Sequence, residues 1–315
     1  MRNIKIIEVP SEIGAGTRGS SMGIDAIKIA ALDFMSNFFI HFPSENIPNE
    51  NRLLFEPIES PYAKRIRGVY TMYERVSNAV RDSLKTNFFP VVLSGDHSIA
   101  GATIAGIRMA DPDSRLGVIW IDAHADLHTP FTTPSGNLHG MPVAISIGED
   151  NLDCAMHQPD DNTLKIWEQL KHLGGIFPKV RPEDMVFISL RDYEKEEKHV
   201  IEKNSMKVIT TSELRRKGPE SIVKRIFRQL NDCTHIYVSF DMDSMDSSIS
   251  RGTGTPVGNG LKEREAEDLI SKFMQNRKIC CFEITEVNPT LDRENLMAEI
   301  AFDILQRSVN ILMMN

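Results

Sequence analysis

The chain has 315 residues, which is long enough for a substantial buried core and favours one large domain or two ordinary ones. Hydrophobic residues make up 41% and charged residues 25%, close to the globular average, so a disordered chain or a coiled coil is disfavoured. Lys and Arg number 36 against 44 Asp and Glu, a net charge of −8, and such an acidic chain is a poor nonspecific partner for nucleic acid or an anionic membrane.

Apolar, β-rich runs alternate with helical patterns along most of the chain. The predicted strands are Ile4–Val9, Phe39–Phe42, Phe89–Ser94, Leu116–Ile121, Met185–Leu190, Lys207–Ile209, His235–Phe240 and Lys278–Ile284. The predicted helices are Gly23–Leu32, Lys64–Lys85, Ser98–Met109, Thr163–His172, Pro219–Asn231, Glu263–Gln275 and Arg293–Ile311. Several strands are continuously apolar, which suits strands buried on both faces. The alternation predicts an α/β fold with a mostly parallel sheet and helices on both sides.

Two stretches are predicted to be loops, Pro43–Pro61 and the acidic segment Glu149–Asn162. The β/α alternation resumes after each, so neither is typical of a domain linker. We therefore expect a single domain over residues 1–315. A plain surface loop is the favoured interpretation of 149–162, with a lid or a subunit contact as the alternatives.

The sequence gives no sign of a membrane or secreted protein. No apolar run approaches the roughly 20 residues that a membrane helix needs, and the first ten residues indicate a strand and not a signal peptide. None of the four cysteines forms a CxxC pair, and we expect reduced core thiols in a cytoplasmic protein. They are Cys154, Cys233, Cys280 and Cys281.

Ionisable side chains follow four of the predicted strands, where the ligand site of an open parallel sheet lies. They are His97, Asp122, His124, Asp126, Asp241, Asp243 and Glu286. Asp122, His124 and Asp126 are two residues apart, so an extended segment projects them to one side.

Four carboxylates gathered without compensation would repel one another, and two divalent cations carrying +4 balance them. Oxygen ligands with a minority of imidazole suit Mn²⁺, while Zn²⁺, Fe²⁺ and Co²⁺ stay open. A pair of such ions activates water near neutral pH, so the pattern predicts metal-assisted hydrolysis without specifying the bond.

These residues carry a resemblance to the ureohydrolase family of arginase, agmatinase and formimidoylglutamase, with arginase the most similar. The matching stretches are Gly14–Gly19, Ser94–Ser98, Asp122–Asp126, Ser239–Asp246, Gly252–Pro256 and Glu286–Pro289. The resemblance implies a three-layer α/β/α sandwich around a parallel sheet of about eight strands.

The resemblance also implies roles for the ionisable residues. One metal would be held by His97, Asp122, Asp126 and Asp241, and the second by Asp122, His124, Asp241 and Asp243. Asp126 would aim the hydroxide that lies between the two metals. Glu286 would hold the guanidinium group, and His139 would carry a proton to the leaving amine.

The substrate end of the implied pocket departs from the family pattern. Thr133 and Ser135 would supply hydroxyls to an α-carboxylate, as in arginases. His128 stands where Asn is usual. Asp192 belongs to the stretch that meets the α-amino group, and Glu194 stands in it where Asp is usual.

Two further departures follow the last metal motif. Ser247 and Arg251 each replace a usual Pro. They are expected to alter loop rigidity alone, although an Arg251 in the pocket mouth would suit an acidic guanidino substrate.

The expected function is that of a Mn²⁺-dependent arginase, which converts L-arginine and water to L-ornithine and urea. Agmatinase, formimidoylglutamase or another guanidino-acid hydrolase is the alternative within the family. A single-zinc deacetylase of related fold and a non-enzymatic binding protein are the alternatives outside it. The resemblance further implies a homo-oligomer, a trimer or hexamer, acting on a small-molecule guanidino substrate.

Overall fold

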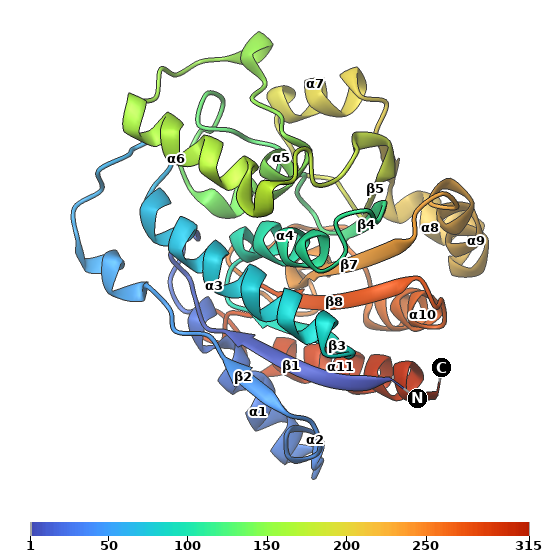
Figure 1. Cartoon of the computed structure of the whole chain (residues 1–315). Helices are drawn as coiled ribbons and strands as arrows, with labels where there is room; N and C mark the ends of the chain where they lie inside the picture. The colour runs from blue at the N-terminus through green and yellow to red at the C-terminus, as the bar shows by residue number, and fades with distance from the viewer. Residues whose placement is uncertain (1, 315) are drawn as a thin grey trace.

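The computed structural model describes residues 2–314 and is built on one sheet of eight strands (Figure 1). The spatial order is β2-β1-β3-β8-β7-β4-β5-β6, and every neighbouring pair is parallel. The strands are β1 (Asn3–Val9), β2 (Ser44–Asn46), β3 (Phe88–Ser94), β4 (Leu116–Ile121), β5 (Met185–Ile188), β6 (Lys207–Ile209), β7 (His235–Asp241) and β8 (Ile279–Thr285). The predicted α/β fold with a parallel sheet of about eight strands is confirmed.

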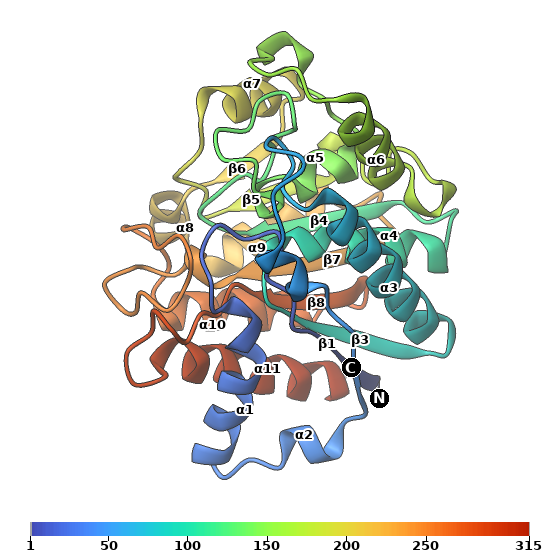
Figure 2. The same cartoon turned by 90° about the vertical axis from the view of Figure 1, so that its left-hand side faces the viewer.

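Helices cover both faces of the sheet (Figures 1 and 2). They are α1 (Gly23–Asp33), α2 (Phe38–His41), α3 (Ile66–Lys85), α4 (Ala100–Ala110), α5 (Pro142–Ile147), α6 (Asp161–Lys171), α7 (Lys195–Lys203), α8 (Thr211–Lys217), α9 (Pro219–Gln229), α10 (Glu263–Met274) and α11 (Leu296–Met314). The layer on one face contains α3 to α7, and the layer on the other contains α1, α2 and α8 to α11.

Two separate hydrophobic cores follow from the two-residue period of the strands. In β4, Ile119 and Ile121 belong to the core beneath α9, α10 and α11, whereas Val118 and Trp120 belong to the core beneath α3 and α4. All six residues of β4 are buried, which explains its continuously apolar sequence.

The prediction of a strand at Phe39–Phe42 is wrong, because most of this run lies in the short helix α2. A short run of aromatic residues has no periodicity that separates strand from helix. The helical turn lets Phe38 pack edge-on against Phe302 of α11, with ring centroids 5.8 Å apart. The edge strand β2 follows instead, inside the predicted loop Pro43–Pro61.

Three further helices, α5, α7 and α8, were not predicted. Each has nine residues or fewer, which is too short for a clear helical period. Three of the cysteines are buried free thiols as expected, but Cys154 is only partly buried. Across residues 2–314, no helix has both the length and the apolar character that crossing a membrane requires.

The sheet order brings the four motif-bearing strands together. β3, β8, β7 and β4 are adjacent at its centre, and their carboxyl ends meet at one edge. β3 and β4 follow each other in the sequence, but β8 and β7 lie between them in the sheet. Where consecutive strands are separated in this way, a crevice for a ligand opens at the carboxyl ends of the strands.

Candidate active site and metal centre

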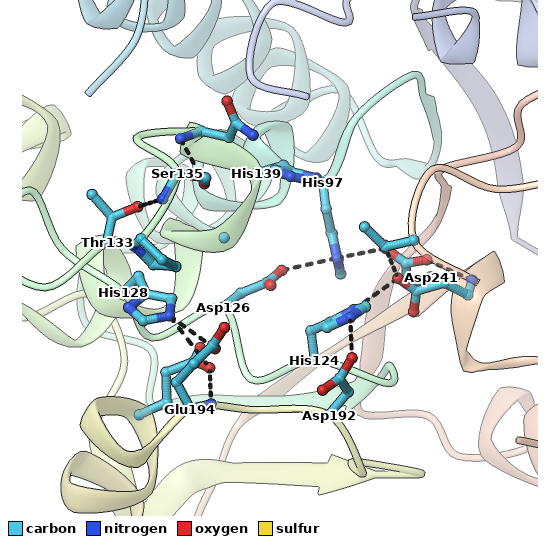
Figure 3. Close-up of a pocket in the computed structure, with 16 residues that line it drawn as sticks. His97, His124, Asp126, His128, Thr133, Ser135, His139, Asp192, Glu194 and Asp241 are labelled. Carbon is cyan, nitrogen blue, oxygen red and sulfur yellow. Dashed lines mark hydrogen bonds and ion pairs between the residues drawn. The ribbon is translucent and has the colours of Figure 1, made fainter. Parts of the chain in front are cut away.

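A cavity of about 320 Å³ lies at the carboxyl ends of the central strands. Its lining residues are His97, His124, Asp126, His128, Thr133, Pro134, Ser135, Asn137, His139, Gly140, Asp192, Glu194, Glu197, Asp241, Asp243 and Thr255. Figure 3 shows most of the predicted site side chains around this space. Asp122 and Glu286 are buried against its wall, through contacts with His97, His124 and His139.

The first group of predicted metal ligands surrounds one nitrogen atom of His97. Its Nδ1 lies 3.0 Å from Asp122 Oδ2, 3.2 Å from Asp126 Oδ2 and 3.0 Å from Asp241 Oδ2. His97 Nδ1 and Asp126 Oδ2 are buried and make no hydrogen bond. Four donor atoms that face one another in this way form a ready set of ligands for a cation.

The second group forms around His124. Its Nδ1 lies 2.8 Å from Asp243 Oδ2 and 3.5 Å from Asp122 Oδ1. Asp122 therefore presents one carboxylate oxygen to each group. Asp241 contacts the first group through Oδ2, and its Oδ1 accepts the backbone N–H of Asp243.

Three side chains to which the sequence analysis assigned no role of their own hold these ligands in place. Trp120 Nε1 donates to Asp122 at 3.0 Å, Ser239 Oγ lies 2.8 Å from His97 Nε2, and Thr255 Oγ1 donates to Asp243 at 2.9 Å. Outer hydrogen bonds of this kind orient metal ligands and tune their affinity. Trp120 lies inside a predicted strand, where an apolar residue carries no functional signal. Ser239 and Thr255 lie in matching stretches, but nothing in the sequence says which ligand each would contact.

The acidic side chains of this site are electrostatically unfavourable on their own. Burial and the neighbouring charge of Asp122 raise the pKa of Asp126 to about 6. Burial together with Asp243 and Asp122 also raises the pKa of Asp241 well above its usual range. Divalent cations would remove this repulsion, so the residues present fit a two-metal centre.

Glu286 and His139 form a pair beside the first group. Glu286 Oε1 accepts the backbone N–H of His97 and lies 3.1 Å from His139 Nδ1, whereas Oε2 is buried with no hydrogen bond. Burial disfavours the charged imidazole of His139, but the hydrogen bond and charge of Glu286 outweigh it and raise the pKa to about 8. The backbone of Glu286 is left-handed, with φ 64°, a strained conformation that recurs at functional sites.

The loop before α5 supplies hydroxyl groups to the cavity. The Thr133 side-chain oxygen accepts the N–H groups of Ser135 and Gly136, and the Ser135 oxygen accepts that of Asn137. Since each oxygen already accepts from the backbone, its own proton is free to be donated to a ligand.

His128 and Glu194, predicted at the substrate end, lie on the opposite side of Asp126 from His97, whereas Asp192 lies beside His124 (Figure 3). His128 Nε2 is 3.0 Å from Glu194 Oε2, and Asp192 is 3.7 Å from His124. Glu197, which was not predicted, is buried 3.7 Å from His128 Nε2. Burial raises the pKa of Glu197 to about 8, while the His128 hydrogen bond lowers that of Glu194 to about 2.

The remaining departures from the family pattern lie away from the cavity. Arg251 is exposed and is absent from the cavity lining, so the hypothesis that it enters the pocket mouth is not supported. Ser247 donates its backbone N–H to Val257 within the same loop.

The acidic segment 149–162 packs against the hydroxyl-bearing loop. Met156 and His157 donate their backbone N–H groups to Phe131, and the His157 ring contacts the Thr133 carbonyl at 2.7 Å. Segment 149–162 thus holds the hydroxyl-bearing loop before α5 through hydrogen bonds to its backbone.

The chain is similar over nearly its whole length to a family model, to characterised proteins and to solved structures. A family model described as "Arginase family" matches residues 2–309. The arginase of Brevibacillus brevis is 34% identical over 96% of both chains, and that of Bacillus subtilis is 33% identical over 97% of both. The solved arginase of Bacillus caldovelox covers 99% of this chain and 98% of its own, with a TM-score of 0.82 and 33% identity. Formimidoylglutamase of Bacillus subtilis covers 99% of this chain and 87% of its own, with a TM-score of 0.74 at 19% identity, which shows a shared fold alone.

Proposed function

The chain belongs to the arginase family, and from that premise we propose that it hydrolyses L-arginine to L-ornithine and urea. One observation carries the proposal. Two imidazole–carboxylate groups share Asp122 at one side of a cavity whose other side carries hydroxyl groups and carboxylates suited to an amino acid.

We propose two Mn²⁺ ions as the cofactors. The first would be held by His97, Asp122, Asp126 and Asp241, and the second by Asp122, His124, Asp241 and Asp243. When bound, such a pair lowers the pKa of a water molecule and stabilises a charged transition state. Asp126, whose Oδ2 belongs to the first group of ligand atoms, would accept a hydrogen bond from the attacking water with its other carboxylate oxygen and so aim it.

Glu286 would orient the guanidinium group. Its Oε1 is held by the backbone of His97, so the side chain is fixed while Oε2 is left to accept a guanidinium N–H. A charge-assisted hydrogen bond in a water-excluded site is strong and directional, which holds a resonance-stabilised electrophile against the nucleophile.

His139 would move the proton that completes the reaction. Attack on the guanidinium carbon gives a tetrahedral intermediate, and its collapse requires a proton on the leaving amine. Nδ1 of His139 is paired with Glu286, so Nε2 is the nitrogen left to exchange a proton in the cavity.

The far end of the cavity would recognise the amino acid. Thr133 and Ser135 have hydroxyl protons free for the α-carboxylate, and Glu194 and Asp192 supply negative charge for the α-amino group. His128 is the ring beside Glu194 and lies within reach of the same end of the substrate.

Further attributes are proposed on the family resemblance: one domain over residues 1–315, assembly as a trimer or hexamer, and a cytoplasmic location. Size-exclusion chromatography with light scattering tests the assembly. A monomer would contradict it.

Metal counting joined to a urea assay tests the proposed chemistry. The purified chain, stripped with chelator and dialysed against Mn²⁺, is expected to retain two tightly held Mn²⁺ ions and to release urea from L-arginine. A single tightly held Zn²⁺ ion with no urea release would favour the single-zinc hydrolase instead.

A further inference from the structure

A carboxylate that the mechanism above does not use is buried beneath the first group of metal-ligand candidates. Glu283 lies in β8, a strand whose residues are all buried. An ionisable side chain inside such a strand is unfavourable unless it is hydrogen-bonded. Three hydroxyl groups contact it: Ser94 Oγ lies 2.8 Å from Oε1, whereas Thr103 Oγ1 and Tyr237 Oη lie 2.6 and 2.8 Å from Oε2. None of these three contacts is made by a cation.

The register of the central strands connects this carboxylate to a metal-ligand candidate. Glu283 pairs with Ser239 across β8 and β7, which are neighbours in the sheet (Figure 1), so both side chains leave the sheet on the same face. Tyr237 precedes Ser239 by two residues and faces the same side. Ser239 Oγ lies 2.8 Å from His97 Nε2. We call Glu283, Tyr237, Ser239 and His97, taken in this order, the hydrogen-bond relay.

The direction of the hydrogen bonds follows from the carboxylate at the end of the relay. Burial raises the pKa of Glu283, but its three hydroxyl partners and the charge of His97 oppose that rise and favour the ionised form. An ionised carboxylate only accepts hydrogen bonds, so Tyr237 donates to it and the phenol oxygen is left to accept.

Ser239 occupies the next position of the relay. Burial and the charge of Glu283 raise the pKa of Tyr237 well above its usual range, and Ser239 opposes that rise as a side-chain hydrogen-bond partner. A hydroxyl lowers the pKa of a phenol by donating to its oxygen. Ser239 then has no proton left for His97, so it accepts a hydrogen bond and Nε2 of His97 carries the hydrogen.

The consequence appears at the other nitrogen of the imidazole ring. A neutral imidazole has one N–H group, so a hydrogen on Nε2 leaves a lone pair on Nδ1. Nδ1 of His97 is the atom that faces the carboxylates of the first group, at 3.0 to 3.2 Å. A metal requires that lone pair, and the hydrogen bond of one ring nitrogen decides whether the other can bind it.

We propose that Glu283 is a positioning residue for His97 and thereby for the first metal. It acts through Tyr237 and Ser239, and it fixes the imidazole tautomer whose Nδ1 binds a divalent cation. The inference rests on the proposed two-metal centre. Glu283→Gln places an amide at the end of the relay, and an amide donates as well as accepts. The hydroxyl groups of the relay can then reverse direction and leave the hydrogen on Nδ1, which weakens binding of the first metal.

Mn²⁺ affinity in a double-mutant cycle of the full-length chain tests the relay without relying on activity. Competition with a chelator is expected to show that Glu283→Gln and Tyr237→Phe each weaken one of the two tight Mn²⁺ equivalents at least about tenfold, and the other less. Glu283→Gln added to Tyr237→Phe is expected to cause at most about a twofold further loss, because the relay is already interrupted. Ser94→Ala is the matched control, since Ser94 donates to the same carboxylate but lies outside the relay.

Each result of the cycle decides for or against the relay. Parent-like affinity for both equivalents in Glu283→Gln would overturn it. Losses that add in the double variant, or an equal loss in Ser94→Ala, would also overturn it, because the carboxylate would then act through packing alone. Tyr237→Phe decides alone if circular dichroism shows that Glu283→Gln does not fold. Failure of the proposed metal centre is distinguishable, since the parent chain itself would then lack two tight equivalents, and the relay would fall with it.

Discussion

Trp120 donates its indole N–H to Asp122 Oδ2 at 3.0 Å, and the same indole is stacked on the imidazole of His97 with ring centroids 4.1 Å apart. One buried side chain of β4 therefore contacts two metal-ligand candidates that come from different strand ends. Trp120 and Asp122 are two residues apart and face the same side of the sheet, so the strand itself positions the donor.

Trp120→Phe is predicted to weaken metal binding while keeping the aromatic stack. The phenyl ring still packs on His97, but Asp122 loses its indole donor, so Mn²⁺ affinity is expected to fall roughly 10–100-fold. Competition with a chelator measures this loss. Trp167→Phe is the matched control, because that buried indole donates to Asp150, away from the site. Equal affinities in the two variants would contradict the role of Trp120.

Asp126→Asn is predicted to abolish turnover without unfolding the chain. The change removes the oxygen that aims the attacking water and a proposed ligand, so kcat is expected to fall at least about 10³-fold. Because the charge of Asp122 raises the pKa of Asp126, a neutral amide relieves repulsion, and the metal-free variant is expected to melt no lower than the parent. Urea release and circular dichroism measure the two effects, with the exposed Asp153→Asn as control. Full activity in Asp126→Asn would refute the site.

His139→Asn is predicted to lower kcat by roughly 10²–10⁴-fold, the range expected for loss of a positioned proton donor. The two tight Mn²⁺ equivalents and the KM for L-arginine are expected to be unchanged, since His139 contacts Glu286 and no proposed metal ligand side chain. Steady-state kinetics and metal analysis separate these quantities, with the exposed His172→Asn as control. A variant that lost metal instead would make His139 a structural residue.

The buried ammonium group of Lys179 is predicted to make the free energy of unfolding depend on pH. This effect does not involve the proposed metal site. Burial, followed by the charge of Lys171, lowers the pKa of Lys179 to about 7 from its usual 10.5. Between these values the unfolded chain binds the additional proton, so this group makes the free energy of unfolding rise with pH, by up to about 1.4 kcal/mol per pH unit. Below pH 7 both states are protonated and the dependence ends.

Lys179→Met is predicted to flatten that rise between pH 7.5 and 9.5. Urea denaturation of the metal-free protein at the two pH values measures the slope, and groups other than Lys179 cancel between parent and variant. The exposed Lys195→Met is the control and is expected to keep the parent slope. An unchanged slope in Lys179→Met would show that the buried ammonium does not lose its proton.

The strand ends and the ligand candidates could be predicted because each carries a local signal. Largely apolar runs mark β3, β4 and β7, and an ionisable residue shortly after such a run has few structural explanations. The family resemblance stated from these motifs is confirmed by the match over residues 2–309.

Other parts of the molecule depend on contacts that no local pattern records. The pairing of Ser239 with His97 exists only because β7 and β3 lie on either side of β8, and the sequence does not give that order. The aromatic run at Phe38–His41 is helical because α11 offers Phe302 as a packing surface. Glu197 was missed since a glutamate in the first turn of a helix is also an ordinary cap.

Urea release from L-arginine and agmatine, offered side by side to the Mn²⁺-loaded chain with a chelated control, tests the central claim most directly. The two compounds differ only in the α-carboxylate that Thr133 and Ser135 are proposed to bind. The account predicts urea from L-arginine, at most a small fraction of that rate from agmatine, and none after chelation. Urea from agmatine at an equal or higher rate, or from neither compound, would contradict it.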